Sequence, residues 1–214
     1  MQDIHILYQD RHMLVINKPS GLLSQPGSIQ DSVSLRLQQQ FPFIGLIHRL
    51  DMATSGIMVL ALSPMALSVI SKQFQNRQTF KVYEAIVFGS LPKSQGQINL
   101  PLRCDWPNRP RQEVHPDGKI SSTHWQCIEP LSLQNEITGK NESCSRVRLI
   151  PHTGRSHQLR VHMMALGFPI VGDYFYAHEQ ALSLSPRLYL HAKTLHLNHP
   201  VTGQRMAFTC EASF

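Results

Sequence analysis

The chain has no apolar run close to the roughly 18 residues that a membrane-spanning helix needs. Its first residues, MQDIHILYQDRHMLVINKP, are charged and alternate in polarity, which is not typical of a secretory signal peptide. These two absences predict a cytoplasmic protein that has no membrane as a partner.

Motifs for redox chemistry and for nucleotide cofactors are also missing. No GxGxxG or P-loop pattern occurs, so the sequence gives no support for a nucleotide cofactor. The cysteines are widely scattered and form no CxxC pair, which predicts reduced and mostly buried thiols. They are Cys104, Cys127, Cys144 and Cys210.

Histidine is abundant, with 12 residues, but its spacing does not favour a metal site. His152, His157 and His162 are five residues apart, whereas zinc-binding pairs on one helix are four apart. The group around His191 and His196 is equally unconvincing. We therefore expect no metal and no cofactor.

Positive charge is in excess, since 20 Lys and Arg residues face 14 Asp and Glu, which gives a net charge of +6. This excess favours a polyanionic partner such as RNA, DNA or an acidic membrane surface. A merely basic protein with no such partner remains an alternative. No block of Lys and Arg stands out, so a disordered nucleic-acid-binding tail is not expected.

The pattern of strands and helices predicts one domain over residues 1–214, because no repeat, low-complexity tract or long linker interrupts it. Three helices are expected. The clearest has Ser63 as N-cap and Pro64 in its first turn, and another ends at Gly167. The helices cover 31–41, 63–77 and 156–166.

Strands outnumber helices and often follow one another directly, which predicts an α+β fold with a large mixed, mainly antiparallel β-sheet flanked by a few helices. The polar stretches 105–120 and 132–143 are expected to be exposed loops. The predicted strands cover 4–9, 12–18, 57–62, 80–88, 98–102, 123–131, 145–151, 188–197 and 205–210.

The segment LIHRLDMATSGIMVLAL (46–62) places charged residues directly before an apolar strand. If HRLD is extended, Arg49 and Asp51 project to the same side, and the hydroxyls of Thr54 and Ser55 follow nearby. A buried ion pair is costly, so such a cluster indicates either a fold-specifying contact or a working site. An aspartate that only caps a turn is the alternative for Asp51.

Two further residues gain interest from their patterns. If a helix begins near Ser156, Arg155 tops its core-facing stripe and needs an acidic partner, for which Asp51 is a candidate; a side chain that bends out to solvent is the alternative. Tyr83 lies in the strand TFKVYEAIV, where it either packs against neighbours or stacks on a planar base.

Together these stretches resemble the RluA family of RNA pseudouridine synthases. The resemblance rests on HRLDMATSGIMVLAL, KVYEAIV and GRSHQLRVHMMALGFPIVGD, together with NKPSGLL and LHAKTLHLNHP. These motifs follow the family's order over almost the whole chain. The stretch CDWPNRPRQEV further resembles the dual-specificity, single-domain members that act on 23S rRNA and tRNA anticodon stem-loops. Since the catalytic pattern begins at the first residues, an N-terminal S4-type RNA-binding domain is expected to be absent.

The resemblance implies a role for each candidate. Asp51 is implied to be the catalytic aspartate, Arg155 its ion-pair partner, and Tyr83 a contact to the target base. Arg49, His48 and Arg160 are implied RNA-binding residues around a central RNA-binding cleft; for His48, a hydrogen bond within the catalytic loop is an alternative. For Lys18 in NKP we prefer a role in setting the turn before Pro19.

The implied reaction detaches uracil from its ribose at N1 and reattaches it through C5, which requires no cofactor. A nearby arginine would favour and orient the carboxylate form of Asp51. A glycosidase would usually show two carboxylates, and only one convincing candidate is found here. The sequence thus predicts a monomeric isomerase of uridine in RNA. A non-catalytic RNA-binding module and a metal-dependent hydrolase are the alternatives.

Overall fold

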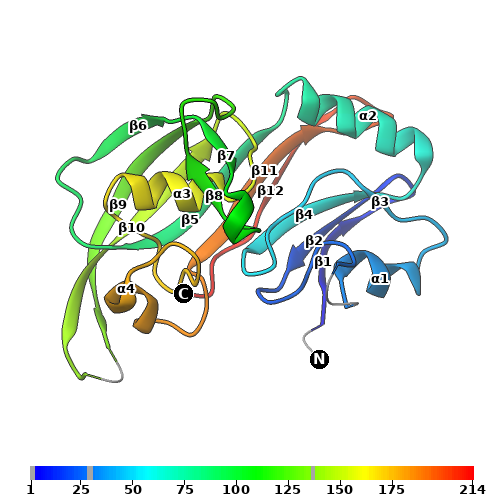
Figure 1. Cartoon of the computed structure of the whole chain (residues 1–214). Coiled ribbons are helices and arrows are strands. Elements are labelled where there is room, and N and C mark those ends of the chain that lie inside the picture. The colour runs from blue at the N-terminus through cyan, green and yellow to red at the C-terminus, as the bar shows by residue number, and fades with distance from the viewer. Residues whose placement is uncertain (1–2, 28–30, 136–137) are drawn as a thin grey trace. The chain divides into compact units, whose positions relative to one another are not determined.

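The computed structural model describes residues 3–27, 31–135 and 138–214, and the chain divides into two compact units. The first unit contains Met1–Lys81 and His191–Ser213, and the second contains Val82–Leu190 with Phe214. The chain enters the second unit within strand β5 (Phe80–Phe88) and returns within β11 (Leu190–Asn198) (Figure 1). One catalytic domain over residues 1–214 stays a prediction.

The first unit is a mixed sheet in which β4 lies between β2 and β11. All its strand pairs are antiparallel except β4 with β11, which run parallel. Helix α2 begins as predicted, because the Ser63 hydroxyl accepts the Ala66 N–H and Pro64 follows it. The remaining elements are β1 (His5–Gln9), β2 (Met13–Lys18), β3 (Gly45–Leu46), β4 (Ser55–Ala61), β12 (Arg205–Thr209), α1 (Val33–Gln38) and α2 (Pro64–Gln75).

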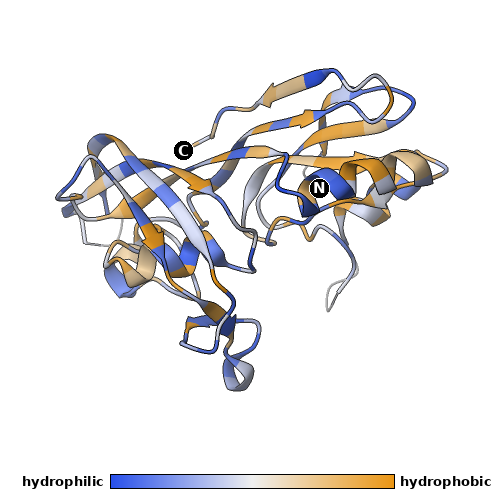
Figure 2. Ribbon diagram, turned by 90° about the horizontal axis from the view of Figure 1, so that it is seen from above, coloured by the Kyte–Doolittle hydropathy of each residue, from blue (hydrophilic) through white to orange (hydrophobic). Residues whose placement is uncertain are grey.

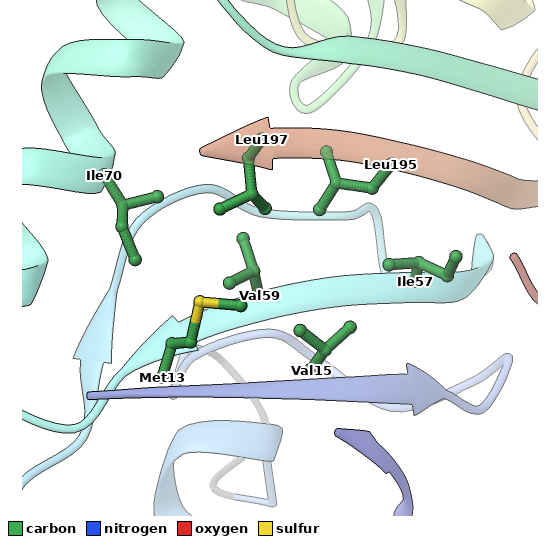
Figure 3. Close-up of a cluster of buried hydrophobic side chains, with 7 residues drawn as sticks. All are labelled: Met13, Val15, Ile57, Val59, Ile70, Leu195 and Leu197. Atoms are coloured by element: carbon green, nitrogen blue, oxygen red, sulfur yellow. The ribbon is translucent and has the colours of Figure 1, made fainter. Parts of the chain in front are cut away.

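Alternate residues of β2, β4 and β11, covered by Ile70 of α2, build the core of this unit (Figure 3). They point to the same side because side chains in a strand alternate between its two faces. Every residue of β4 is buried, which explains its continuous apolar run after Ser55. Burying each large aliphatic side chain contributes about 1.5–3 kcal/mol. The cluster consists of Met13, Val15, Ile57, Val59, Ile70, Leu195 and Leu197.

The second unit contains an antiparallel sheet in the order β5, β10, β9, β6 and a small hairpin of β7 and β8. Orange, hydrophobic stretches mark many strands in Figure 2, and the turns are largely blue or white. Its elements are β6 (Gln95–Asn99), β7 (Leu102–Cys104), the 3-10 helix η1 (Trp106–Asn108), β8 (Gln112–Val114), β9 (Ser122–Gln134), β10 (Asn141–Pro151), α3 (Gln158–Ala165) and α4 (Glu179–Ser183).

The predicted class, α+β with mainly antiparallel strands and few helices, is confirmed. The prediction of plain loops is wrong in two places. Residues 105–120 contain η1 and β8, because short strands can pair with each other without an apolar run. Much of 132–143 is strand, since β9 and β10 extend into it; residues 136 and 137 lie outside the described residues. Of the thiols, only Cys144 is fully buried.

Gly56 is required where β4 runs alongside β11, and its substitution gives a first prediction. Its φ is +111°, and a Cβ atom would overlap the backbone of Ala192. Gly56→Ala should therefore lower the free energy of unfolding by about 3 kcal/mol or more, measured by urea denaturation. Gly203→Ala is the control, because Gly203 also has a positive φ of +69° but has open space around it. Equal losses in the two variants would contradict the proposed steric cause.

Candidate active site

The segment that carries Asp51 is fixed through its backbone by two serines. The Ser24 hydroxyl donates to the Leu50 carbonyl at 2.7 Å and accepts the Leu50 N–H at 3.1 Å. The Ser20 hydroxyl donates to the Ala53 carbonyl at 2.7 Å. The residues on both sides of Asp51 are thereby tied to the segment that follows β2.

Lys18 adds a third connection from the end of β2. Its side chain is fully buried, and its Nζ donates to the carbonyls of Pro19 (2.8 Å), Leu22 (2.8 Å) and Met52 (3.1 Å). Burial lowers the pKa of Lys18 to about 7, while the charge of Asp51 acts in the opposite direction. These contacts support the interpretation of Lys18 as a residue that sets a turn, but this turn follows Pro19 instead of preceding it, and the contact of Lys18 extends to the loop of Asp51.

Asp51 itself is half-buried at the turn that leads into β4. Its backbone carbonyl accepts the Thr54 N–H at 3.1 Å. The Ser55 hydroxyl is directed to His191, with a distance of 2.9 Å to Nδ1, and Nε2 of His191 lies 3.1 Å from the Cys210 carbonyl. Ser55 therefore connects β4 to β11, and its hydroxyl has a structural partner.

The neighbouring residues His48 and Arg49 have different surroundings. His48 Nε2 accepts the Val59 N–H at 3.1 Å, and its ring stacks on Phe74 with 4.7 Å between centroids. Burial lowers the pKa of His48 to about 3, so the ring is neutral at physiological pH. These contacts favour a structural role for His48, with its hydrogen bond to β4 rather than to the catalytic loop. The Arg49 side chain is exposed.

Arg155 does not occupy the position on the helix that its spacing predicts. The prediction that Arg155 tops the core-facing stripe of its helix is wrong, and the alternative of a side chain directed to solvent is confirmed, because α3 begins at Gln158 and the Arg155 side chain is exposed. Its backbone is nevertheless well fixed: the Gln158 Oε1 accepts the Arg155 N–H at 3.1 Å and the Thr153 hydroxyl at 2.7 Å. His157, between them, has the unusual φ of +52°.

The inward-directed cation of this helix is Arg160, which is 3 % exposed. It binds the fully buried Asp173 through two hydrogen bonds, Nε to Oδ2 at 2.8 Å and the second terminal nitrogen to Oδ1 at 2.6 Å. Asp173 also accepts the Phe175 N–H at 3.0 Å. This burial favours a structural role for Arg160 over the predicted contact with RNA.

Tyr83 lies half-buried on β5, where it pairs with Leu149 of β10. Its neighbour Glu84 is buried on the opposite face and binds Arg146 at 2.7 Å. The alternation of β5 thus follows the prediction, with Tyr83 and Ala85 on one face and Glu84 on the other.

Neither a metal site nor a membrane-spanning helix is found in the part of the chain that the structure describes. There, no three side chains of His, Cys, Asp or Glu gather to hold a metal ion. No helix in the same residues is long and apolar enough to cross a bilayer.

Comparison with known proteins identifies the family. A model described as RNA pseudouridylate synthase matches residues 12–165, which contain the Asp51 loop, β5 and all of α3. The chain belongs to this family. Family membership confirms the predicted activity, the isomerisation of uridine to pseudouridine in RNA, and RNA as the substrate.

High similarity to RNA pseudouridine synthases extends over almost the whole chain. The "dual-specificity RNA pseudouridine synthase RluA" of Yersinia pestis is 49 % identical over 213 residues, covering 98 % of this chain and 99 % of that protein. The protein of the same description from Haemophilus influenzae is 49 % identical over 215 residues, covering 99 % and 94 %. The predicted resemblance to the RluA type is confirmed. The solved structure of human RNA pseudouridylate synthase domain containing 1 has a TM-score of 0.85 at 28 % identity, covering 99 % of this chain and 84 % of that one.

Sequence reasoning missed the residues that support the Asp51 loop and the stretch with Arg155 and Arg160 in this pseudouridine synthase. Ser20 and Ser24 follow NKP closely, but nothing in their spacing predicts a partner near residue 50. Asp173 ends the matching stretch GRSHQLRVHMMALGFPIVGD, yet the spacing did not reveal its pairing with Arg160. An acidic residue at the end of that stretch was the one available signal.

Lys18→Met should lower the free energy of unfolding by about 2 kcal/mol, because the Pro19 and Leu22 carbonyls lose this donor and the Met52 carbonyl keeps only the Gly21 N–H. It should also change the dependence on pH. Between pH about 7 and 10.5 the unfolded chain binds a proton at this lysine that the folded chain has released. Lys18 therefore makes the free energy of unfolding rise with pH in this interval, and Lys18→Met should remove that rise. Urea denaturation at pH 7 and pH 9 measures both effects.

The exposed Lys72 provides the control for this experiment, since Lys72→Met removes a lysine without removing a buried contact. If both variants keep the same pH dependence as the wild type, the buried ammonium of Lys18 does not titrate as described.

Arg160→Ala should lower the free energy of unfolding by about 3–5 kcal/mol, because it leaves the Asp173 carboxylate buried without its cation. The double variant Arg160→Met with Asp173→Leu removes both charges and should recover much of that loss. Thermal or urea denaturation measures the effect. A loss of RNA affinity at unchanged stability would instead assign Arg160 to the RNA-binding surface.

Proposed function

We propose that this pseudouridine synthase acts on two classes of RNA, stem-loops of 23S rRNA and the anticodon stem-loop of tRNA. Its relatives in Yersinia pestis and Haemophilus influenzae carry the description "dual-specificity", and the similarity extends over almost their full length. The stretch CDWPNRPRQEV supports the same assignment by its resemblance to such members. Action as a monomer in the cytoplasm stays a prediction.

Asp51 is the catalytic residue in this proposal. The reaction breaks the bond between N1 and C1′, forms one between C5 and C1′, and moves a proton from C5 to N1. Asp51 acts as an anion, either by attacking the nucleotide or by removing a sugar proton. The observation that supports this role is the backbone support of its loop, in which Lys18 and the serines at 20 and 24 fix the neighbouring carbonyls.

Arg155 and Tyr83 complete the proposed site. We assign to Arg155 the ion pair with the Asp51 carboxylate in the enzyme bound to RNA, where the guanidinium favours the charged form. An exposed guanidinium on a fixed backbone suits this role. Tyr83 contacts the target base in this proposal. Its ring is half-buried on β5, so one part of the ring is accessible to a base.

Recognition of RNA requires that the target nucleotide leave its stack, because the sugar carbon is not accessible within a helix. Loop nucleotides are partly unstacked already, which favours stem-loops as substrates. The net charge of +6 supplies attraction to phosphates that weakens as salt increases. In this proposal the exposed Arg49 lies against the RNA beside the extruded uridine.

The test of this proposal is Asp51→Asn on RNA that lacks pseudouridine. Purified wild type and variant are incubated with total tRNA and with 23S rRNA, and pseudouridine is mapped by chemical modification and primer extension. We expect sites in both RNAs with the wild type and none with Asp51→Asn, whose RNA affinity should stay within about twofold because the substitution is isosteric. Asp3→Asn is the matched control, since Asp3 is exposed and outside the proposed site.

Different results separate the parts of the proposal. Undiminished turnover by Asp51→Asn would reject Asp51 as the catalytic residue. Sites in one class of RNA alone would reject dual specificity. Salt-sensitive binding with no pseudouridine from the wild type would favour a non-catalytic RNA-binding module.

A further inference from the structure

The hairpin of β7 and β8 in the second unit displays a large aromatic side chain to solvent. Trp106, in η1 between the two strands, is 67 % exposed, and the guanidinium of Arg109 lies 4.7 Å from the centre of its ring. Water is a poor environment for an indole ring, so an exposed tryptophan is a feature of binding surfaces. The contact with Arg109 orients the ring and adds positive charge beside it.

Two arginines of this hairpin lie over aromatic rings instead of pairing with carboxylates of the described residues. Arg111 lies 5.8 Å from the Phe175 ring, as Arg109 does over Trp106 at 4.7 Å. Arg103, in contrast, forms an ion pair with Glu113 at 2.8 Å. A guanidinium over a ring keeps its charge, and N–H donors that no carboxylate occupies are suited to phosphate oxygens.

The hairpin is fixed to the segment that follows Asp173. The Gln112 N–H donates to the Tyr176 hydroxyl at 2.8 Å, and the same hydroxyl lies 2.6 Å from Nδ1 of His157. His157 in turn lies two residues after Arg155, and β8 lies beside α3 (Figure 1). The position of the aromatic surface is therefore coupled to the segment that carries Arg155.

A second exposed ring belongs to this segment. Tyr174 is 77 % exposed and lies edge-on to Phe175, with 5.6 Å between ring centroids. The hairpin and this segment thus offer two accessible aromatic rings and two arginines whose guanidinium groups lie over aromatic rings. This composition matches surfaces that bind unpaired nucleotides, where rings stack on bases and arginines contact phosphates.

We propose that Trp106, Arg109, Arg111 and Tyr174 form a platform on which unpaired nucleotides of the substrate stem-loop stack. The inference rests on the proposed function, because it assigns to the same RNA substrate a second contact surface. Trp106 stacks on a base, and the arginines bind the adjoining phosphates. This surface would contribute to the choice of loop, since stacking requires a base that is already free of its helix.

Trp106→Ala tests the platform. Affinity is measured in the Asp51→Asn background with a tRNA anticodon stem-loop at fixed salt, and kcat and KM are measured in the otherwise wild-type chain. We expect Trp106→Ala to raise Kd and KM about 10-fold with little change in kcat, and Trp106→Phe to retain part of the affinity because it keeps a ring. Ile120→Ala is the control, since Ile120 is 80 % exposed close to the hairpin but cannot stack.

Fluorescence provides a readout that does not depend on turnover. The chain has two tryptophans, of which Trp125 is 4 % exposed, so quenching by acrylamide reports mainly on Trp106. The stem-loop should protect this fluorescence from acrylamide. Trp106→Phe should show only the weak quenching of Trp125, which also verifies that the variant is folded.

The outcomes distinguish this inference from the proposed function. Protection of Trp106 by RNA supports the platform even if the wild type forms no pseudouridine. The absence of pseudouridine would reject only the proposed function. Unchanged affinity, KM and quenching in an active enzyme would overturn the platform. A change in sedimentation with unchanged RNA affinity would also overturn it and assign the surface to contacts between copies of the chain.

Discussion

One buried lysine side chain connects the loop of Asp51 to the end of β2. A lysine inside a protein normally loses more through desolvation than it gains, and Lys18 is stabilised by three carbonyls from two different segments. The Met52 carbonyl also accepts the Gly21 N–H at 2.8 Å, so the backbone and Lys18 together connect the two segments. The same group therefore satisfies the turn after β2 and fixes the backbone next to Asp51, so the position of the carboxylate follows from the fold of the first unit.

Two arginines on either side of the start of α3 have different surroundings, although they belong to one sequence motif. Arg155 and Arg160 are five residues apart in one motif, but Arg155 is exposed before the helix and Arg160 is buried against Asp173. The buried pair fixes the segment of Phe175 and Tyr176 on the helix, and Gln158 fixes the backbone of Arg155. A rigid support thus leaves one guanidinium available for an RNA or carboxylate partner.

Local patterns were sufficient to predict most strands, the cap of α2 at Ser63 and the α+β class, because these depend on alternation and on residues that are neighbours in sequence. The direction of Arg155 could not be predicted, since it depends on His157 adopting a left-handed conformation that moves the helix start to Gln158. The partners of Lys18 and Arg160 also escaped prediction, because Met52 and Asp173 are 34 and 13 residues away. The hairpin around Trp106 could not be predicted either, because its apolar pattern is too short to indicate strands.

The parallel pairing of β4 with β11 has a consequence for synthesis of the chain. β4 is completely buried, and β11 follows it by about 130 residues, so the ribosome releases β4 long before its partner exists. Until then an apolar strand edge remains open in the nascent chain. The Asp51 loop leads directly into β4, so the strand that follows this loop acquires its last neighbour only after β11 has been translated.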